Sequence, residues 1–154
     1  MKIGTKSERY DTYFQALYDE MTEQHHFTGA YRPVEGRPYY VFTSSRGIRY
    51  IAGFDRAGRV YTSLVINSGN YEKNKNFFDT LRKRESEINV KFKVPLYWAR
   101  RDDIKSSVIS ISRDGTIDTD ESKLEAFRAW HIASLLKFKA VFDPEIQTVL
   151  NPLR

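Results

Sequence analysis

The chain has 154 residues, the length of one ordinary domain, and its 40% hydrophobic and 14% aromatic content is enough for a core, which excludes general disorder. It has no cysteine, so disulfides and thiolate metal sites are excluded. The N-terminal residues lack the apolar run of a signal peptide, and no stretch approaches the roughly 18 apolar residues of a membrane span. We therefore expect a single domain over residues 1–154, a cytoplasmic location and no membrane association.

The net charge of +5 is concentrated in the middle of the chain. Residues 30–60 carry a net charge of +4 and residues 71–105 carry another +4, whereas both ends of the chain are net acidic. A basic middle of this kind fits a surface that faces a polyanion. The alternative is that long lysine and arginine side chains only solvate the faces of strands and helices, and the sequence leaves both interpretations open.

The N-terminal half predicts a helix followed by a β-meander. Tyr10, Phe14 and Leu17 recur at the spacing of one apolar helical stripe. This spacing predicts a helix over 7–21, with Ser7 as a candidate N-cap. Period-two alternation and β-branched residues then predict three antiparallel strands. These strands are expected at residues 38–43, 48–55 and 60–66.

A second helix is predicted over residues 71–88. Phe78, Leu81 and Ile88 lie at helical spacing and are expected to share its apolar face. Charged residues of alternating sign are expected on its solvated face. They are Glu72, Lys73, Lys75, Arg82, Lys83, Arg84 and Glu87.

The C-terminal part predicts two further strands and a last helix. The strands are expected at residues 94–100 and 107–112. The helix is expected over 123–142, with Asp120 or Ser122 as its N-cap and Pro144 as its stop. The resulting order, α-β-β-β-α-β-β-α, predicts an α+β domain in which helices cover a twisted, mainly antiparallel sheet.

The second half of the chain also carries the pattern of a known family. The pattern consists of Asn74-Lys-Asn-Phe-Phe-Asp-Thr-Leu81, Glu87-Ile88, Leu96-Tyr-Trp-Ala-Arg100, Asp102-Asp103, Trp130 and Val141-Phe142-Asp-Pro144. It resembles a bacterial, archaeal and viral domain family of unknown function that is often joined to a restriction-endonuclease-like nuclease domain. The match covers residues 8–146 and is strongest over 74–144, although Ala99 stands where family members usually have an acid. The resemblance implies an accessory or standalone module near nucleic-acid-processing or defence systems, and it supplies no catalytic residue.

No pattern of catalytic or metal-binding residues is complete. Glu121 and Lys123 have the spacing of the acid-x-Lys pair of a restriction-type nuclease, but they precede an expected helix rather than lying on a strand. His25 and His26 are sequence neighbours that point in different directions, so they are not expected to bind one metal together. His131 falls on an apolar helix face, where a hydrogen-bonded core histidine is expected. We therefore expect no catalytic residue, no metal and no cofactor.

Basic residues near the expected turns form the best candidate site. The candidate nucleic-acid-binding residues are Arg46, Arg49, Arg56, Arg59, Arg100, Arg101 and Lys105, with Arg32 and Arg37 before the first strand. Arginine donors at strand ends suit phosphate oxygens, and Tyr39, Tyr50 and Tyr61 are candidates for stacking or hydrogen bonding. The two tryptophans are expected in the core rather than in base stacking.

The Arg-Arg-Asp-Asp segment over 100–103 has two interpretations. Arg100 and Arg101 face a phosphate in one of them. In the other, they pair with Asp102 and Asp103 and only lock the connection between two strands. The sequence does not separate these interpretations.

The sequence favours a non-enzymatic module that binds nucleic acid, DNA in preference to RNA, through phosphate contacts. Its expected origin is a phage, a mobile element or a defence system. A second hypothesis is an oligomeric protein-interaction or small-ligand-capture domain, with a homodimer as the simplest assembly, because abundant aromatic residues favour interfaces. A divalent-metal-dependent nuclease is the third hypothesis.

Overall fold

The computed structural model describes residues 4–27 and 32–150, so the predicted domain over 1–154 includes residues outside the described part. In chain order the elements are α1 (Lys6–Glu23), β1 (Tyr39–Ser45), β2 (Ile48–Phe54), β3 (Arg59–Ile66), α2 (Tyr71–Arg82), α3 (Glu85–Asn89), β4 (Tyr97–Ala99), β5 (Ser107–Asp114) and α4 (Glu121–Leu150). The three predicted strands of the meander are therefore present as β1, β2 and β3, and the predicted strand over 107–112 is present as β5.

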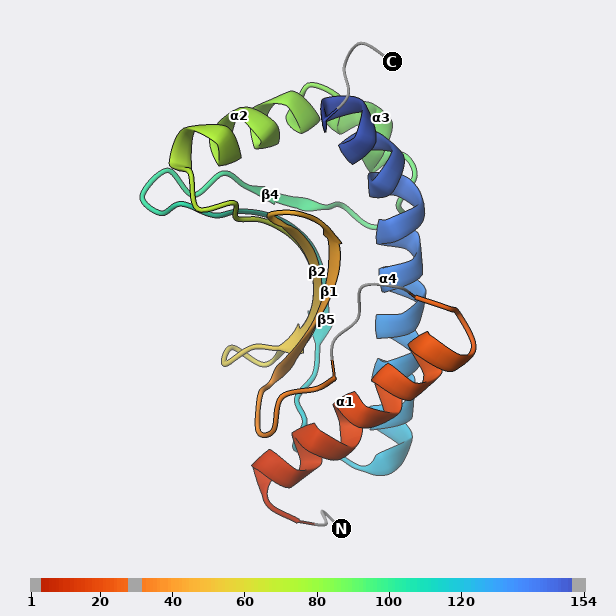
Figure 1. Ribbon diagram of the computed structural model, residues 1–154. Helices are drawn as coiled ribbons and strands as arrows, with labels where there is room; N and C mark the ends of the chain where they lie inside the picture. Colours follow the sequence, from red (N-terminus) through yellow and green to blue (C-terminus); the bar gives the residue numbers. More distant parts are fainter. Residues whose placement is uncertain (1–3, 28–31, 151–154) are drawn as a thin grey trace.

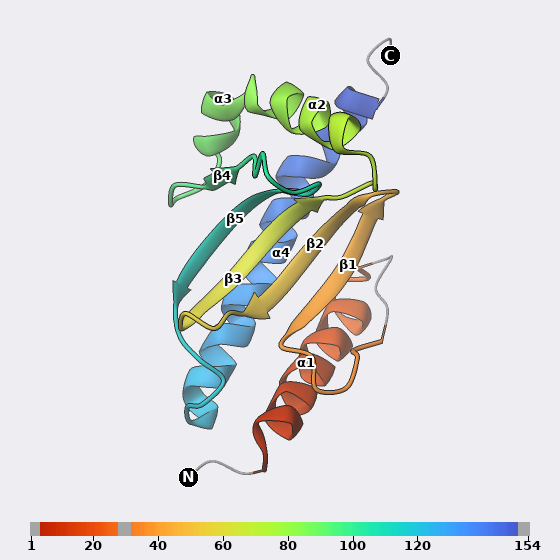
Figure 2. The same cartoon turned by 90° about the vertical axis from the view of Figure 1, so that its left-hand side faces the viewer.

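The five strands form one antiparallel sheet in the order β1-β2-β3-β5-β4. The helices α1 and α4 cover one face of this curved sheet, and α2 and α3 lie across one end of it (Figure 1). Figure 2 looks at the other, concave face, and none of the described helices lies in front of it. The predicted α+β class and antiparallel sheet are confirmed, with the helical cover restricted to one face.

Alternate residues of the strands face α1 and α4 and form the core with them. Phe54 of β2 packs edge-to-face against Tyr13 and Phe14 of α1, with ring centroids 5.0 and 6.0 Å apart. Phe42 of β1 has no exposed surface. Eight of the ten phenylalanines are buried, so the aromatic residues serve mainly the interior of the domain.

Side-chain caps determine where the first and last helices begin. Thr5, rather than the predicted Ser7, caps α1, because its hydroxyl accepts a hydrogen bond from the Glu8 N–H at 3.1 Å in a capping box. Asp120 caps α4 as predicted and accepts a hydrogen bond from the Lys123 N–H at 3.0 Å. This hydrogen bond stabilises the carboxylate and lowers the pKa of Asp120.

The predicted helix over 71–88 is two helices, and the strand after it is short. Arg84 leaves the helical region, with φ −106° and ψ 21°, and its N–H bonds the Leu81 carbonyl in a tightened turn at 2.9 Å. The chain therefore changes direction between α2 and α3. The predicted strand over 94–100 is wrong in extent, because β4 pairs with β5 only at Tyr97–Ala99. Pro95 has no N–H for a ladder, which explains the late start.

The prediction that Pro144 ends the last helix is also wrong. α4 continues from Glu121 to Leu150 with Pro144 inside it. The φ of proline is compatible with a helix, so the helix can continue through Pro144. It loses the hydrogen bond that the missing N–H would make, and it must accommodate the ring. Beyond the proline, Glu145 and Ile146 are buried, and Glu145 accepts two hydrogen bonds from Arg84 at 2.7 and 3.0 Å. This packing holds the last turns of α4 in place.

His131 is a core residue, as the sequence predicts. It is fully buried, and its Nε2 lies 3.0 Å from the Tyr61 carbonyl, which can only accept a hydrogen bond. Its Nδ1 therefore carries no proton and accepts the hydroxyl proton of Tyr13 at 2.5 Å. Burial lowers the pKa of His131 to about 4, so the ring is neutral at neutral pH.

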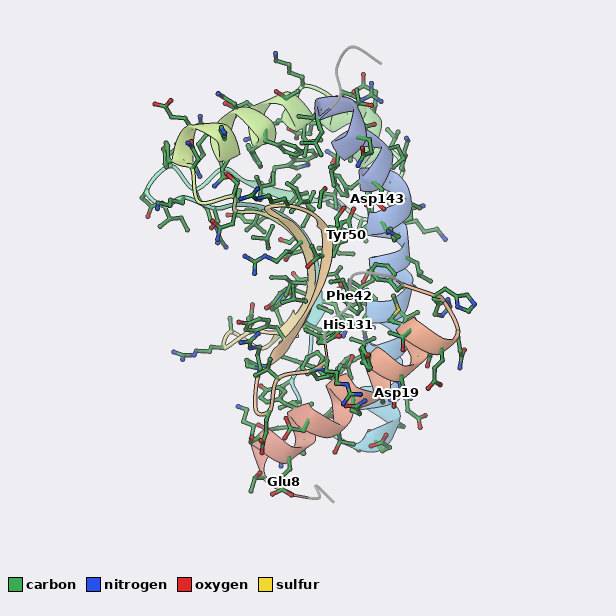
Figure 3. The ribbon with its side chains drawn as sticks, in the orientation of Figure 1. Glu8, Asp19, Phe42, Tyr50, His131 and Asp143 are labelled. Atoms are coloured by element: carbon green, nitrogen blue, oxygen red, sulfur yellow. The ribbon has the colours of Figure 1, made fainter. Side chains whose placement is uncertain are left out.

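Tyr50 connects the sheet to α4. Its ring is buried on the helix-covered face, and its hydroxyl donates a hydrogen bond to the Asp143 carboxylate at 2.5 Å (Figure 3). Asp143 also accepts hydrogen bonds from Ser44 at 3.0 Å and from Lys139 at 2.7 Å. Tyr50 is therefore a structural residue, and its predicted role in stacking a ligand is wrong. Burial, followed by the bond to Asp143, raises the pKa of Tyr50.

Candidate nucleic-acid interface

The concave side of the sheet, which we call the open face, is formed by the strand residues that point away from α1 and α4. Three rows of neighbouring residues cross it. They are Tyr39, Gly53, Tyr61 and Ser112; then Val41, Ile51, Ser63, Ser110 and Tyr97; then Thr43, Arg49, Val65, Val108 and Ala99. Beyond the first row, Arg59 pairs with Asp114, the only acid that the described strands place on this face. The open face therefore combines aromatic, aliphatic and hydroxyl groups with an excess of positive charge.

The ring of Tyr61 lies across Gly53 in the neighbouring strand. A Cβ atom on Gly53 would be 2.6 Å from the Tyr61 hydroxyl oxygen and 2.7 Å from its Cζ. The same Cβ would be 2.8 Å from the Cβ of Tyr39 on the other side. Only glycine leaves enough space here, so the missing side chain of Gly53 allows the Tyr61 ring to lie over the strand. Burial raises the pKa of Tyr61 to about 12, so its hydroxyl keeps its proton at neutral pH.

A hollow of about 420 Å³ lies along β1 at one edge of the open face. We call it the β1-edge hollow; it is lined by Arg32, Val34, Arg37, Tyr39, Tyr40, Val41, Thr43 and Arg49. Within the described part of the chain, none of its three arginines has a carboxylate within 4.0 Å. The Arg37 guanidinium lies 4.9 Å from the centre of the Tyr39 ring. The β1-edge hollow therefore offers unneutralised positive charge to an anion.

The loop between β4 and β5 is attached to α2 by a buried lysine. Lys75 is only 2% exposed, so its predicted place on the solvated face of the helix is wrong. Its ammonium group lies 2.6 Å from the Arg100 carbonyl, 2.8 Å from the Arg101 carbonyl and 2.9 Å from the Ser106 carbonyl. The Ser107 hydroxyl lies 3.0 Å away. Burial, followed by repulsion from Arg100, lowers the pKa of Lys75.

Asn74 provides a second attachment for the same loop. Its side-chain amide donates a hydrogen bond to the Lys105 carbonyl at 3.1 Å, and its oxygen accepts hydrogen bonds from the backbone N–H and the hydroxyl of Ser68 at 2.9 and 2.6 Å. Tyr71 adds a hydrogen bond from its hydroxyl to the Asp102 carbonyl at 2.6 Å. The N-terminal half of α2 therefore holds the loop mainly through main-chain carbonyl groups.

The structure separates the two arginines of the 100–103 segment. Arg100 forms ion pairs with Asp79 of α2 and with Asp102, which raise the pKa of its guanidinium. Arg101 is exposed, makes none of the ion pairs found among the described residues, and has a positive φ of 57°. The ion-pair interpretation therefore describes Arg100, with Asp79 as an additional partner, whereas Arg101 projects from the loop as a charged residue open to solvent.

The other predicted basic residues lie at two ends of the sheet. Arg46 is in the β1–β2 turn and Arg49 follows it on the open face, at the end nearest α2 (Figure 2). Arg56 is in the β2–β3 turn at the opposite end, and Arg59 next to it is paired with Asp114. Lys105 is exposed in the loop before β5. The predicted basic residues therefore do not form one patch. Arg49 lies instead with Arg32 and Arg37 in the β1-edge hollow.

Two residues of this region were not singled out by the sequence. Tyr97 is 68% exposed and lies on the open face, because its neighbour Trp98 points into the core. Period-two alternation around the predicted core residue Trp98 is the signal that identifies it. Lys75 lies three residues before the buried Phe78, and this spacing places it on the packed side of α2.

A comparison with protein families gives one match. The family described as "Domain of unknown function (DUF4268)" matches residues 7–146. The chain belongs to this family. The DUF4268 match includes all five strands and both attachments of the loop to α2. Comparisons with curated proteins and with solved structures found no match.

The structure also bears on metal binding and on membranes. Among residues 4–27 and 32–150 of this DUF4268 domain, no three histidine or carboxylate side chains are grouped so that they could hold a metal ion. His25 and His26 are exposed at the end of α1, far along the chain from the buried His131. None of the described helices is long and apolar enough to cross a membrane.

Proposed function

We propose that this domain binds nucleic acid on the open face of its sheet, with the β1-edge hollow as the principal phosphate contact. The observation that carries the proposal is the grouping of Arg32, Arg37 and Arg49 around one hollow without a carboxylate partner among the described residues. Guanidinium groups at such a place suit phosphate oxygens, which they bind with charge-assisted hydrogen bonds.

The composition of the open face supports a polyanion as the ligand. The one acid that the described strands place on this face, Asp114, is already paired with Arg59. The partly exposed hydroxyl groups of Thr43 and Ser110 add neutral hydrogen-bonding positions, and no other acid on the described strands opposes a phosphate backbone. This arrangement favours binding through the backbone with limited sequence readout.

The role in a larger system follows from the family resemblance. We infer that the domain serves a restriction-type or other defence system, or a phage or mobile element, by holding nucleic acid near a nuclease that another domain or chain supplies. DNA is the preferred ligand in this setting, and the domain itself needs no catalytic residues for it.

Fluorescence anisotropy with labelled 20-nucleotide DNA and RNA, single-stranded and duplex, tests the proposal at 50 and 200 mM salt. We expect micromolar or tighter binding at 50 mM salt that weakens at 200 mM salt. Arg49→Glu should weaken binding about tenfold, because it replaces a phosphate donor by a repulsive carboxylate in the β1-edge hollow.

Arg56→Glu is the matched control. It makes the same change of charge at an exposed turn at the other end of the sheet, and we expect it to change the affinity less than threefold. Equal losses for both variants would show that only net charge matters. No salt-sensitive binding by the unmodified protein would refute the proposal outright.

The high aromatic content gives no separate support to an oligomeric protein-interaction domain. Most phenylalanines pack within the domain, together with Tyr13, Tyr40 and Tyr50. The core therefore accounts for most of the aromatic surplus that motivates that alternative.

A further inference from the structure

The Tyr61 ring is held in an orientation suited to stacking. It occupies the space above Gly53 where any other residue would place its Cβ, so one side of the tyrosine rests on the β2 backbone. Tyr61 is one of the strand residues of the open face and is half-buried, and none of the described helices lies in front of that face (Figure 2). A flat ring fixed on a sheet is the surface on which proteins of several folds stack nucleobases.

Tyr97 provides a second ring on the same surface. Ser63, on the same strand as Tyr61, and Ser110 on β5 lie in the row that ends at Tyr97. With strands about 4.8 Å apart and about 3.4 Å per residue, the Cα atoms of Tyr61 and Tyr97 are about 12 Å apart. Small hydroxyl side chains beside the half-buried Tyr61 ring and the exposed Tyr97 ring leave room for a ligand that passes over both.

The β1-edge hollow adds charge at one side of this aromatic surface. Arg37 lies against Tyr39, whose neighbour in the same row is Gly53 under the Tyr61 ring. The arginines that would bind phosphate therefore lie next to the rings that would stack bases. A ligand that satisfies both must carry phosphates and accessible aromatic bases. In a duplex the bases are stacked on one another and paired, so their faces are not available.

We propose that the open face binds single-stranded nucleic acid, with bases stacked on Tyr61 and Tyr97 and a phosphate in the β1-edge hollow. The inference rests on the proposed function and specifies its substrate class. Stacking makes the affinity depend on the bases as well as on the backbone, and it gives single strands an advantage over duplexes.

The test compares three labelled probes at 50 mM salt: a 12-nucleotide oligothymidine, an abasic 12-mer with the same phosphates, and a 12-base-pair duplex. We expect the oligothymidine to bind at least tenfold more tightly than the abasic strand and more tightly than the duplex. Tyr61→Leu and Tyr97→Leu should each reduce the preference for oligothymidine over the abasic strand about fivefold or more, while leaving the affinity for the abasic strand within twofold.

Tyr18→Leu is the matched control, because it removes a partly buried tyrosine ring of α1 on the helix-covered side. It should leave the preference unchanged, and circular dichroism should show that all three variants are folded. Equal affinity for oligothymidine and abasic strand would overturn the stacking inference while leaving the proposed phosphate binding intact. A preference for the duplex would also overturn it. Failure to bind any of the three probes would overturn both proposals.

Discussion

His131 illustrates how a single buried residue links the stability of the fold to pH. Its two nitrogens have opposite roles: Nε2 donates to the Tyr61 carbonyl and Nδ1 accepts from Tyr13. A second proton on the ring would end the present hydrogen bond from Tyr13, since Nδ1 would become a donor, and would place a charge without an acidic partner in the core. His131 therefore also supports the open face, because the carbonyl that it binds belongs to Tyr61, whose ring we expect to stack a base.

Lowering the pH should destabilise the protein through His131. Its pKa is about 6.5 in the unfolded chain and about 4 in the fold, so the unfolded state binds a proton first as the pH falls. Above about pH 6.5 the protonation of His131 therefore does not reduce the free energy of unfolding. Below that pH the free energy of unfolding should decrease by about 1.4 kcal/mol per pH unit, until the folded state also becomes protonated near pH 4. Urea unfolding at pH 7.0, 6.0 and 5.0 measures this slope.

The exposed histidines supply the control for that measurement. A variant with His25→Asn and His26→Asn should keep the slope, because neither side chain is buried. His131→Gln should lose most of this slope of the free energy of unfolding between pH 6.5 and 5, where few carboxylates titrate. A slope that persists in His131→Gln would assign the pH dependence to other groups.

At the scale of elements, α2 and the loop over 100–106 behave as one unit. Lys75 and Asn74 reach the loop from adjacent positions of the helix, and Arg100 returns an ion pair to Asp79 one turn later. All three contacts use residues of the Asn74–Leu81 motif. This motif therefore builds the support for a loop beside the open face rather than a site of its own.

Replacing Lys75 by methionine should destabilise the domain by about 3 kcal/mol, because it leaves three partly buried carbonyl groups without their charged donor. Hydrogen exchange over 100–106 should become faster at the same time, since the loop loses its anchor. Lys73→Met is the control: Lys73 is exposed on the same helix, and the free energy of unfolding should change by less than about 0.5 kcal/mol. Similar effects of both substitutions would contradict the structural role of Lys75.

For the whole molecule, the decisive feature is that one face of the sheet is covered and the other is not. The class, the element order apart from the break between α2 and α3, and the core histidine could be predicted from the sequence, because hydrophobic periodicity determines them. The open face could not, since alternation along β1 to β3 shows that the strands have two different faces but not which elements cover each one. For the same reason the sequence pattern predicts one cluster of arginines at the two hairpin turns. Antiparallel strands place successive turns at opposite ends of a sheet, so these arginines are separated.

Helix boundaries were predictable only where local chemistry decides them. Asp120 is one of the two N-cap candidates that the sequence offers for the last helix, because a cap acts within one turn. The continuation of α4 through Pro144 depends on Arg84, which is 61 residues away in the sequence from Glu145. No local pattern contains that contact.

The distribution of charge over the molecule predicts how binding depends on salt. If the three arginines of the β1-edge hollow are the principal phosphate contacts, the logarithm of the binding constant for a single strand should fall with the logarithm of salt concentration with a slope of about −2. Anisotropy titrations at five salt concentrations measure the slope. A value steeper than about −4 would require phosphate contacts well beyond this hollow and would contradict its leading role.

The loop over 100–106 is held by its backbone, and this has a consequence for how the domain can diversify. Lys75 and Asn74 bind carbonyl oxygens, which are present whatever the side chain is, while the side chains at 101–105 all face solvent. The loop conformation is thus largely independent of the loop sequence. We expect the residues displayed there to be exchangeable without refolding, much as antibodies vary a loop on a constant framework, and a library randomised at positions 102–105 should yield mostly folded proteins.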